Sequence, residues 1–117
     1  MAVGTPNIKS FYMNQPATTS TLLYTAPANS GNQTAPYATA VIKEIWLVNT
    51  DSTDQTVTIG IGGVAAAQQL IPTQKVPANT AVPITGLNKL VPAGGTVYGL
   101  QSKATAITVH IDGVEVQ

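Results

Sequence analysis

The sequence of 117 residues contains no cysteine and no arginine, and only 9% of its residues are charged. Without cysteine, disulfide bonds cannot stabilise the fold, and thiolate chemistry is excluded. Five lysines balance five acidic residues, so the chain lacks the cationic surplus with which proteins bind phosphate backbones. We therefore expect no direct contact with nucleic acid. Because soluble domains usually have about 25% charged residues, part of this surface is expected to be buried against other subunits.

Long hydrophobic runs are also absent. The apolar stretches are far shorter than the roughly 20 residues that a bilayer-spanning helix needs, so no membrane partner is expected. Residues 1–16 show no basic leader followed by an apolar block. No secretory signal is visible, and we expect synthesis in a cytoplasm.

What the sequence does contain is a series of short runs rich in β-branched residues, with no sustained helical period. Pro-Ala followed by Asn or Gly precedes three of the runs, at 25–30, 75–80 and 90–96, and predicts tight turns. Seven or eight strands at this spacing predict an all-β fold, an antiparallel β-sandwich or jelly roll formed by residues 21–117, with an up-and-down barrel as the alternative. The runs occupy residues 21–25, 39–50, 55–61, 70–76, 80–85, 87–91, 96–102 and 106–112.

Residues 1–20 are rich in Thr, Asn, Pro, Gln and Ser, and we predict that they form an extended N-terminal arm. Their one apolar cluster is IKSFYM, at residues 8–13. A disordered tail is the alternative, although such tails are poor in aromatic residues. We expect Phe11 and Tyr12 to anchor the arm in a groove on a neighbouring subunit or shell protein.

The run at residues 39–50 is apolar on both faces, although a strand in a single core needs only one apolar face. We expect Ile45 and Leu47 to face the core. The opposite face, with Ile42, Trp46 and Val48, is then expected to lie at an interface, covered by a neighbouring subunit or by the arm. Trp is enriched among the residues that dominate binding energy, which favours this assignment.

Candidate catalytic and metal-binding residues are few. His110 is the only histidine; it could act with Asp112 as a base or as two metal ligands, but a solvent-facing strand position explains it better. Residues 51–54, DSTD, offer two carboxylates but lack the carboxylate density and the closing glutamate of a calcium loop, so they predict a turn. Residues 60–63, GIGG, are not followed by the Lys-Ser/Thr of a phosphate loop. We expect no catalytic residue, no metal and no cofactor, and hence no enzyme.

Two stretches resemble virion structural proteins of tailed bacteriophages. They are LLYTAPA followed, after a polar spacer, by AVIKEIWLVNTDSTDQTVTIGI, and the C-terminal LVPAGGTVYGLQSKATAITVHIDGVEV. The resemblance covers approximately residues 22–116 and leaves out the arm. It implies a β-sandwich subunit that acts by assembly, is made in the host cytoplasm and resides in the virion. One small domain with an arm and little charge favours a capsid decoration (cement) protein within that group.

A decoration protein is expected to form a homo-oligomer, with a trimer as the favoured form, and to bind the major capsid protein or another shell protein. Two alternatives stay open. One is a tail or baseplate accessory protein. The other is a carbohydrate-binding module for host attachment, but such modules present several exposed aromatics, and the chain has only one Trp, four Tyr and one Phe.

Overall fold

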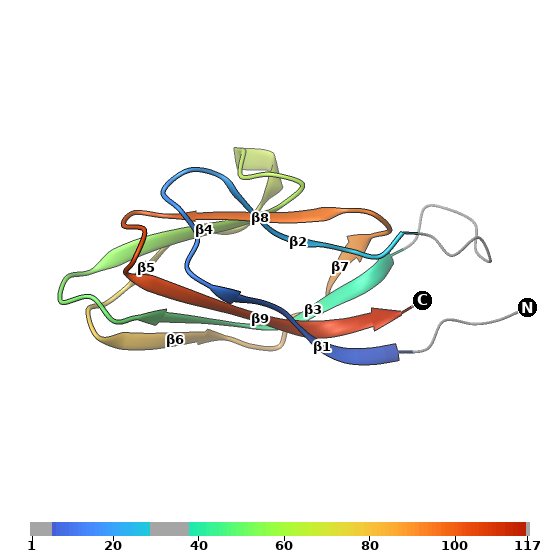
Figure 1. Ribbon diagram of the computed structural model, residues 1–117, viewed down its shortest axis with the longest axis horizontal. Coiled ribbons are helices and arrows are strands. Elements are labelled where there is room, and N and C mark those ends of the chain that lie inside the picture. The colour runs from blue at the N-terminus through green and yellow to red at the C-terminus, as the bar shows by residue number, and fades with distance from the viewer. Residues whose placement is uncertain (1–5, 29–37, 117) are drawn as a thin grey trace, which may run out of the picture.

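The computed structural model describes residues 6–28 and 38–116. These residues form nine strands, arranged in two antiparallel sheets that pack face to face (Figure 1). The all-β sandwich expected from the sequence is confirmed, with nine strands in place of seven or eight. The strands are β1 (Pro6–Asn14), β2 (Thr21–Thr25), β3 (Ala38–Asn49), β4 (Gln55–Ile61), β5 (Gln69–Val76), β6 (Thr80–Ile84), β7 (Lys89–Pro92), β8 (Thr96–Gln101) and β9 (Ile107–Val116), with a short 3₁₀ turn at Ala66–Gln68.

The two sheets differ in the number of strands and in the order of those strands. One has the strand order β2-β8-β4-β5. The other has the order β1-β9-β3-β6, and β7 also pairs with β3. Because β7 pairs with the first half of β3 and β6 with the second half, the two short strands share one edge of β3. The long strand β3 therefore lies at the centre of the five-stranded sheet.

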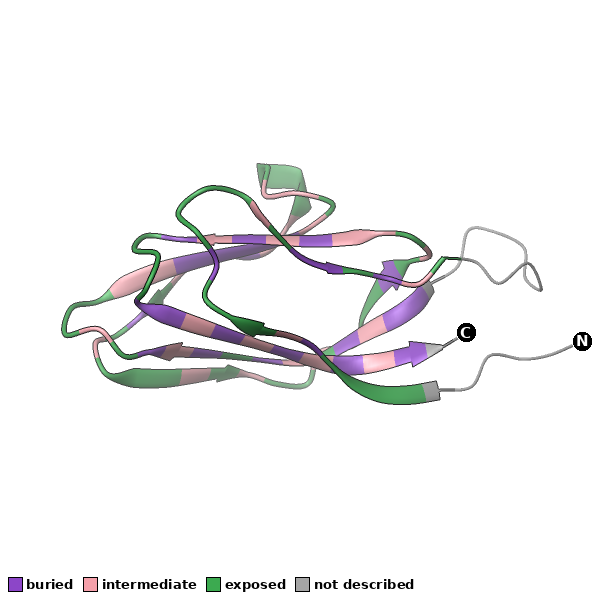
Figure 2. Ribbon diagram, viewed as in Figure 1, coloured by how far each residue is buried: buried purple, intermediate pink, exposed green. Residues whose placement is uncertain are grey.

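The core lies between the sheets, and buried positions alternate with more exposed ones along β3, β8 and β9 (Figure 2). This alternation follows from the two-residue period of a strand. Ile45 and Leu47 are fully buried, as expected from the sequence. The other large side chains with no exposed surface are Ile42, Val57, Ile59, Val76, Val91, Val97, Ile107, Val109 and Ile111.

Two of the three predicted turns lie wholly within the described residues. Asn79 has φ +52° between β5 and β6, and Gly94 has φ +72° between β7 and β8. Asn and Gly are the residues that tolerate this left-handed backbone best, which is why each follows a Pro-Ala pair at the turn. The remaining turn, at 25–30, extends beyond the described residues.

Nine residues of the predicted arm, Pro6–Asn14, form a strand of the sandwich. β1 pairs with β9 along its whole length, from Pro6 opposite Val116 to Asn14 opposite Val109. Phe11, expected to anchor on a neighbour, is only 8% exposed and belongs to the core of its own chain. Tyr12 is half-buried and packs against the same core. The extended arm is thus corrected to an edge strand over residues 6–14.

A bulge and a glycine explain why Phe11 turns inward. The register of β1 against β9 shifts between Ser10 and Tyr12, and Phe11 is the extra residue. A Cβ atom at Gly113 would lie 2.7 Å from Cε2 of Phe11, so only glycine leaves space for the ring there. The Phe11 ring stacks on Tyr24, with centroids 4.1 Å apart and planes 10° from parallel.

A second bulge corrects the expected faces of β3. The register against β9 shifts between Ile42 and Glu44. The extra residue, Lys43, lets Ile42 and Ile45 face the same side, although they are three positions apart. Ile42 has no exposed surface and lies in the core, so it is not on the face that carries Trp46.

Candidate functional site

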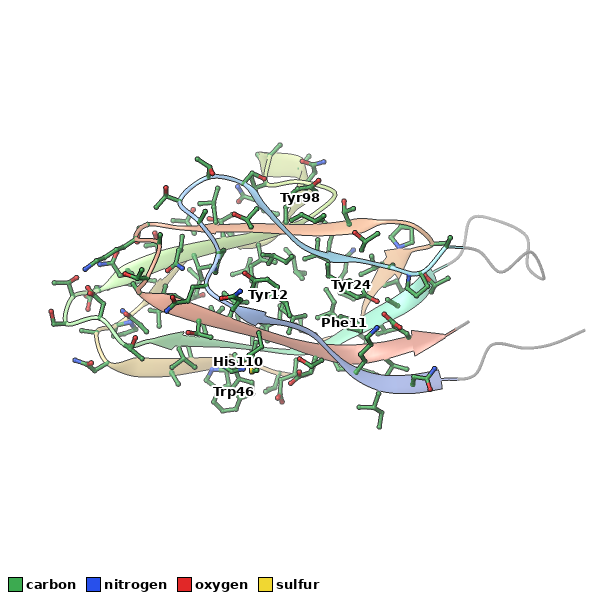
Figure 3. The ribbon with its side chains drawn as sticks, in the orientation of Figure 1. Phe11, Tyr12, Tyr24, Trp46, Tyr98 and His110 are labelled. Atoms are coloured by element: carbon green, nitrogen blue, oxygen red, sulfur yellow. The ribbon has the colours of Figure 1, made fainter. Side chains whose placement is uncertain are left out.

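The side of the five-stranded sheet that points away from the four-stranded sheet, hereafter the outer face, carries most of the exposed apolar side chains. Figure 3 shows Trp46 and His110 projecting from this side, whereas Phe11 and Tyr24 lie between the sheets. Among the described residues, five large hydrophobic side chains are classed as exposed, and only Leu22 lies on the other sheet. The four on the outer face are Ile8 (93%), Met13 (67%), Leu90 (58%) and Trp46 (37%).

Strand register arranges the outer face in rows, because residues directly opposite one another point to the same side. The first, here called the apolar row, crosses four strands. Val114 of β9 is opposite both Ile8 of β1 and Val41 of β3, and Val41 is opposite Leu90 of β7. Apolar side chains from both ends of the sequence therefore form one band.

A second row, here called the aromatic row, crosses the sheet farther along β3. His110 of β9 is opposite both Met13 of β1 and Trp46 of β3, and Trp46 is opposite Pro83 of β6. Val48 follows two residues later on the same face. Trp46 and Val48 thus lie on the outer face, as the sequence predicted.

Between these two rows lies an acidic row. Glu44 of β3 is opposite Asp112 of β9, which is opposite Ser10 of β1. Trp46 donates a hydrogen bond from Nε1 to Oε1 of Glu44, 2.6 Å away. Like charges directly opposite on neighbouring strands destabilise a sheet. The acidic row therefore lowers the folding stability of the subunit.

The acidic and aromatic rows meet in a shallow hollow lined by Glu44, Trp46, Val48, His110 and Asp112. His110 is half-buried on the face opposite the buried Val109 and Ile111, which confirms the strand position expected for it. Within residues 6–28 and 38–116, no three side chains of His, Cys, Asp or Glu lie close enough together to hold a metal ion.

The remaining acidic residues are paired with lysines. Lys75 lies 3.1 Å from Asp54, and Lys103 lies 2.8 Å from Asp51. Asp51 also accepts hydrogen bonds from Thr53, within the turn expected at residues 51–54. The Lys103 ammonium and the Thr53 side chain hold the pKa of the Asp51 carboxyl well below its ordinary range. This acid closes a turn at one end of the sandwich.

A polar cluster around the buried Glu115 carboxylate ties β1 to the rest of the sandwich. Glu115 of β9, 6% exposed, accepts a hydrogen bond from the Tyr24 hydroxyl, and its Oε2 lies 3.3 Å from Nζ of Lys9. Burial, followed by the hydrogen bond to Glu115 and the charge of that carboxylate, raises the pKa of Tyr24 above its ordinary value. No local sequence pattern brings these three residues together, because their pairing depends on strand register.

Of the five residues expected at an interface, the structure brings Trp46 and Val48 together on the outer face. It places Phe11 and Ile42 in the core, with Tyr12 against it. Ile8, Met13 and Leu90 were not predicted at an interface, although they have the exposure expected of interface residues. The signal available for Leu90 was its position next to Val91: adjacent apolar residues in a strand point to opposite faces.

Comparison with known proteins identifies no family: no family model and no curated protein matches the chain. Among solved structures, the "Cyanophage Pam1 capsid asymmetric unit" aligns with 97% of this chain and 86% of that chain, with a TM-score of 0.49 and 16% sequence identity. Within the part of the chain that the structure describes, no helix has the length and apolar character needed to cross a membrane.

Proposed function

We propose that this chain is a structural protein of a tailed-bacteriophage virion, and specifically a capsid decoration protein that acts through subunit contacts without catalysis. The observation that carries the proposal is the outer face. It presents Ile8, Met13 and Leu90 with more than half of their surface exposed, and large apolar side chains gathered on one exposed face mark an interaction surface.

The sequence supports the choice of a virion. Residues 22–116 resemble virion β-domains, and the chain combines a low charge content with no net charge. Near-zero charge favours association over repulsion between copies. In this proposal the outer face is buried against other subunits, in a homo-oligomer for which a trimer remains the expected form, and against a shell protein of the capsid.

The chain offers a matched pair of variants to test the outer face. Leu90, on the outer face, is 58% exposed, and Leu22, on the opposite sheet, is 50% exposed. Both Leu90→Ser and Leu22→Ser should leave folding stability within about 0.5 kcal/mol, as is usual for surface substitutions. Only Leu90→Ser should reduce incorporation when purified protein is added to phage particles that lack it.

Equal incorporation of the two variants would refute the role of the outer face. Electron microscopy of the parent particle separates decoration from the tail or baseplate alternative, because it shows which component the density of the sandwich covers. Density on the tail would refute the decoration role while leaving the virion assignment in place.

A further inference from the structure

Two carboxylates of the outer face have no positive partner in their own chain. Within the described residues, Glu44 and Asp112 enter no ion pair, and the Asp112 side chain accepts no hydrogen bond. They lie opposite each other in the acidic row, where their like charges oppose folding. A positive group supplied from outside the subunit would relieve this repulsion.

The hollow at these carboxylates adds an aromatic side chain. It has a volume of about 290 Å³, and Figure 3 shows Trp46 projecting from the sheet beside His110. The hydrogen bond from Nε1 to Glu44 holds the indole next to one of the two carboxylates. An ammonium or guanidinium group over an indole ring is attracted by the ring as well as by nearby carboxylates. The chemistry of this hollow therefore suits a basic side chain.

A second hollow adjoins the first at Val48, which lines both. It has a volume of about 280 Å³ and is lined by Val48, Asn49, Thr50, Asn79, Thr80 and Ala81. Its lining is polar and apolar but carries no charge, and within the described residues the Asn79 side chain makes no hydrogen bond. The two hollows, here together called the groove, are acidic at one end and neutral at the other, so a ligand that fills both is elongated.

The lysines of this chain are placed elsewhere. Three of the five form the ion pairs described above. The fourth, Lys43, donates from Nζ to Oδ1 of Asn88, 2.5 Å away. The fifth, Lys89, lines a separate hollow with Ile61 and Leu70, on the side of the four-stranded sheet. A different protein is therefore a better source of a basic group for the groove than a second copy of this chain.

We propose that the groove binds an extended segment of another virion shell protein, with a lysine or arginine side chain over Trp46, between Glu44 and Asp112. The inference rests on the proposed function, because it names the chemistry of a partner for the same outer face. Charge complementarity carries it: two unpaired carboxylates beside an indole match a basic group, and such matching fixes the register of a bound partner. The exposed rows on either side match apolar neighbours in the segment, which continues past Val48 to the amide of Asn79.

Tryptophan fluorescence gives a readout confined to the groove, because Trp46 is the only tryptophan in the chain. The probes are three peptides, acetyl-Thr-Val-X-Val-Thr-amide, in which X is lysine, glutamine or glutamate. The lysine peptide should change the emission saturably and bind about tenfold more tightly than the glutamine peptide, since two surface ion pairs and an exposed cation–π contact add to its affinity. The glutamate peptide should bind more weakly than both. A high concentration of sodium chloride should remove the preference for lysine.

Neutralising the acidic row tests the role of the carboxylates. Glu44→Gln with Asp112→Thr removes the like charges and keeps an acceptor for the Trp46 indole N–H. This variant should lose the preference for the lysine peptide, yet unfold in urea at a midpoint no lower than that of the wild type, so lost binding cannot be attributed to unfolding. Asp54→Asn is the matched control, because its carboxylate is 50% exposed and pairs with Lys75 away from the groove. It should bind all three peptides as the wild type does.

Several results would overturn the inference. Equal affinities for the lysine and glutamine peptides, or a neutralised variant that keeps the preference, would show that the carboxylates do not select a basic group. If acetyl-lysine methylamide binds as tightly as the lysine peptide, the groove takes a free amine and not a segment. If sedimentation shows that the wild type self-associates and the neutralised variant does not, a second copy covers the row.

The particle assay separates this inference from the proposed function. If the peptides show no preference for lysine while Leu90→Ser still fails to enter particles, decoration stands and the basic segment is wrong. If the preference holds while Leu90→Ser enters particles normally, the groove stands and the role of the outer face in decoration is wrong. Where both hold, the neutralised variant should need about tenfold more protein than the wild type to reach the same occupancy on particles.

Discussion

The most informative perturbation of this molecule is Phe11→Ala, because it tests whether residues 6–14 belong to the sandwich. The ring of Phe11 is 8% exposed, stacks on Tyr24 and covers Gly113. Removing a buried phenylalanine ring costs about 3–5 kcal/mol in a core, and the lost stack accounts for about 0.5–1.5 kcal/mol of it. An edge strand can also detach while the rest of the domain stays folded. We therefore expect Phe11→Ala to lower the free energy of unfolding by about 3 kcal/mol, at the lower end of that range.

Two assays measure this loss. Urea unfolding should show a lower midpoint, and native-state hydrogen exchange should show lost protection in β1 and in the amides of β9 that pair with it. Met13→Ala is the matched control: Met13 is on the same strand, 67% exposed on the outer face, and should change stability by less than about 0.5 kcal/mol. Deleting the chain through Asn14 should destabilise the sandwich further, because Glu115 would then be buried without Lys9.

The contrary result is a Phe11→Ala variant that unfolds at the wild-type midpoint, with the amides of β1 and β9 as protected as in the wild type. In that case Phe11 does not belong to the core, and residues 1–20 would again be an arm free to dock on a neighbour.

Three further outcomes follow from the core. Leu47→Ala, at a position with no exposed surface, should cost about 2–5 kcal/mol in urea unfolding. Gly113→Ala should cost at least about 1–3 kcal/mol, since a Cβ atom there would lie 2.1 Å from the Val41 carbonyl oxygen; a neutral result would contradict the close approach of these strands. Tyr24 has a raised folded pKa, so its stabilisation is complete below the unfolded pKa of about 10 and is lost as the pH rises above it. In an alkaline titration followed by tyrosinate absorbance, the Tyr24 ionisation that accompanies this loss of stability should be absent from Tyr24→Phe.

The strands and their approximate bounds could be predicted because β-branched runs and Pro-Ala turns are local signals. β2 and β4 were predicted at their observed bounds, 21–25 and 55–61. β1 was not, because its bulge puts Phe11 and Tyr12 next to each other against the core and breaks the alternation that marks a strand. The same physical cause misplaced Ile42: one extra residue in β3 reverses the faces of everything before it.

The outer face could be predicted only in part. Trp46 and Val48 share a face by alternation within a single strand. That Met13 lies opposite His110, or Ile8 opposite Val114, depends on pairing between the two ends of the chain, and no local pattern contains that register. The pairing of the acidic row has the same origin, since it joins the middle of β3 to β9.

The pairing of β1 with β9 also has a consequence for synthesis. The earliest strand that the structure describes has its hydrogen-bonding partner about 100 residues later in the chain, so β1 must wait on the ribosome until β9 emerges. Such long-range pairing slows folding and leaves unpaired edges exposed in the interval. A nascent chain that stops before residue 107 lacks the strand that joins β1 to β3, and we expect it to be degraded or to aggregate rather than to accumulate as a partial sandwich.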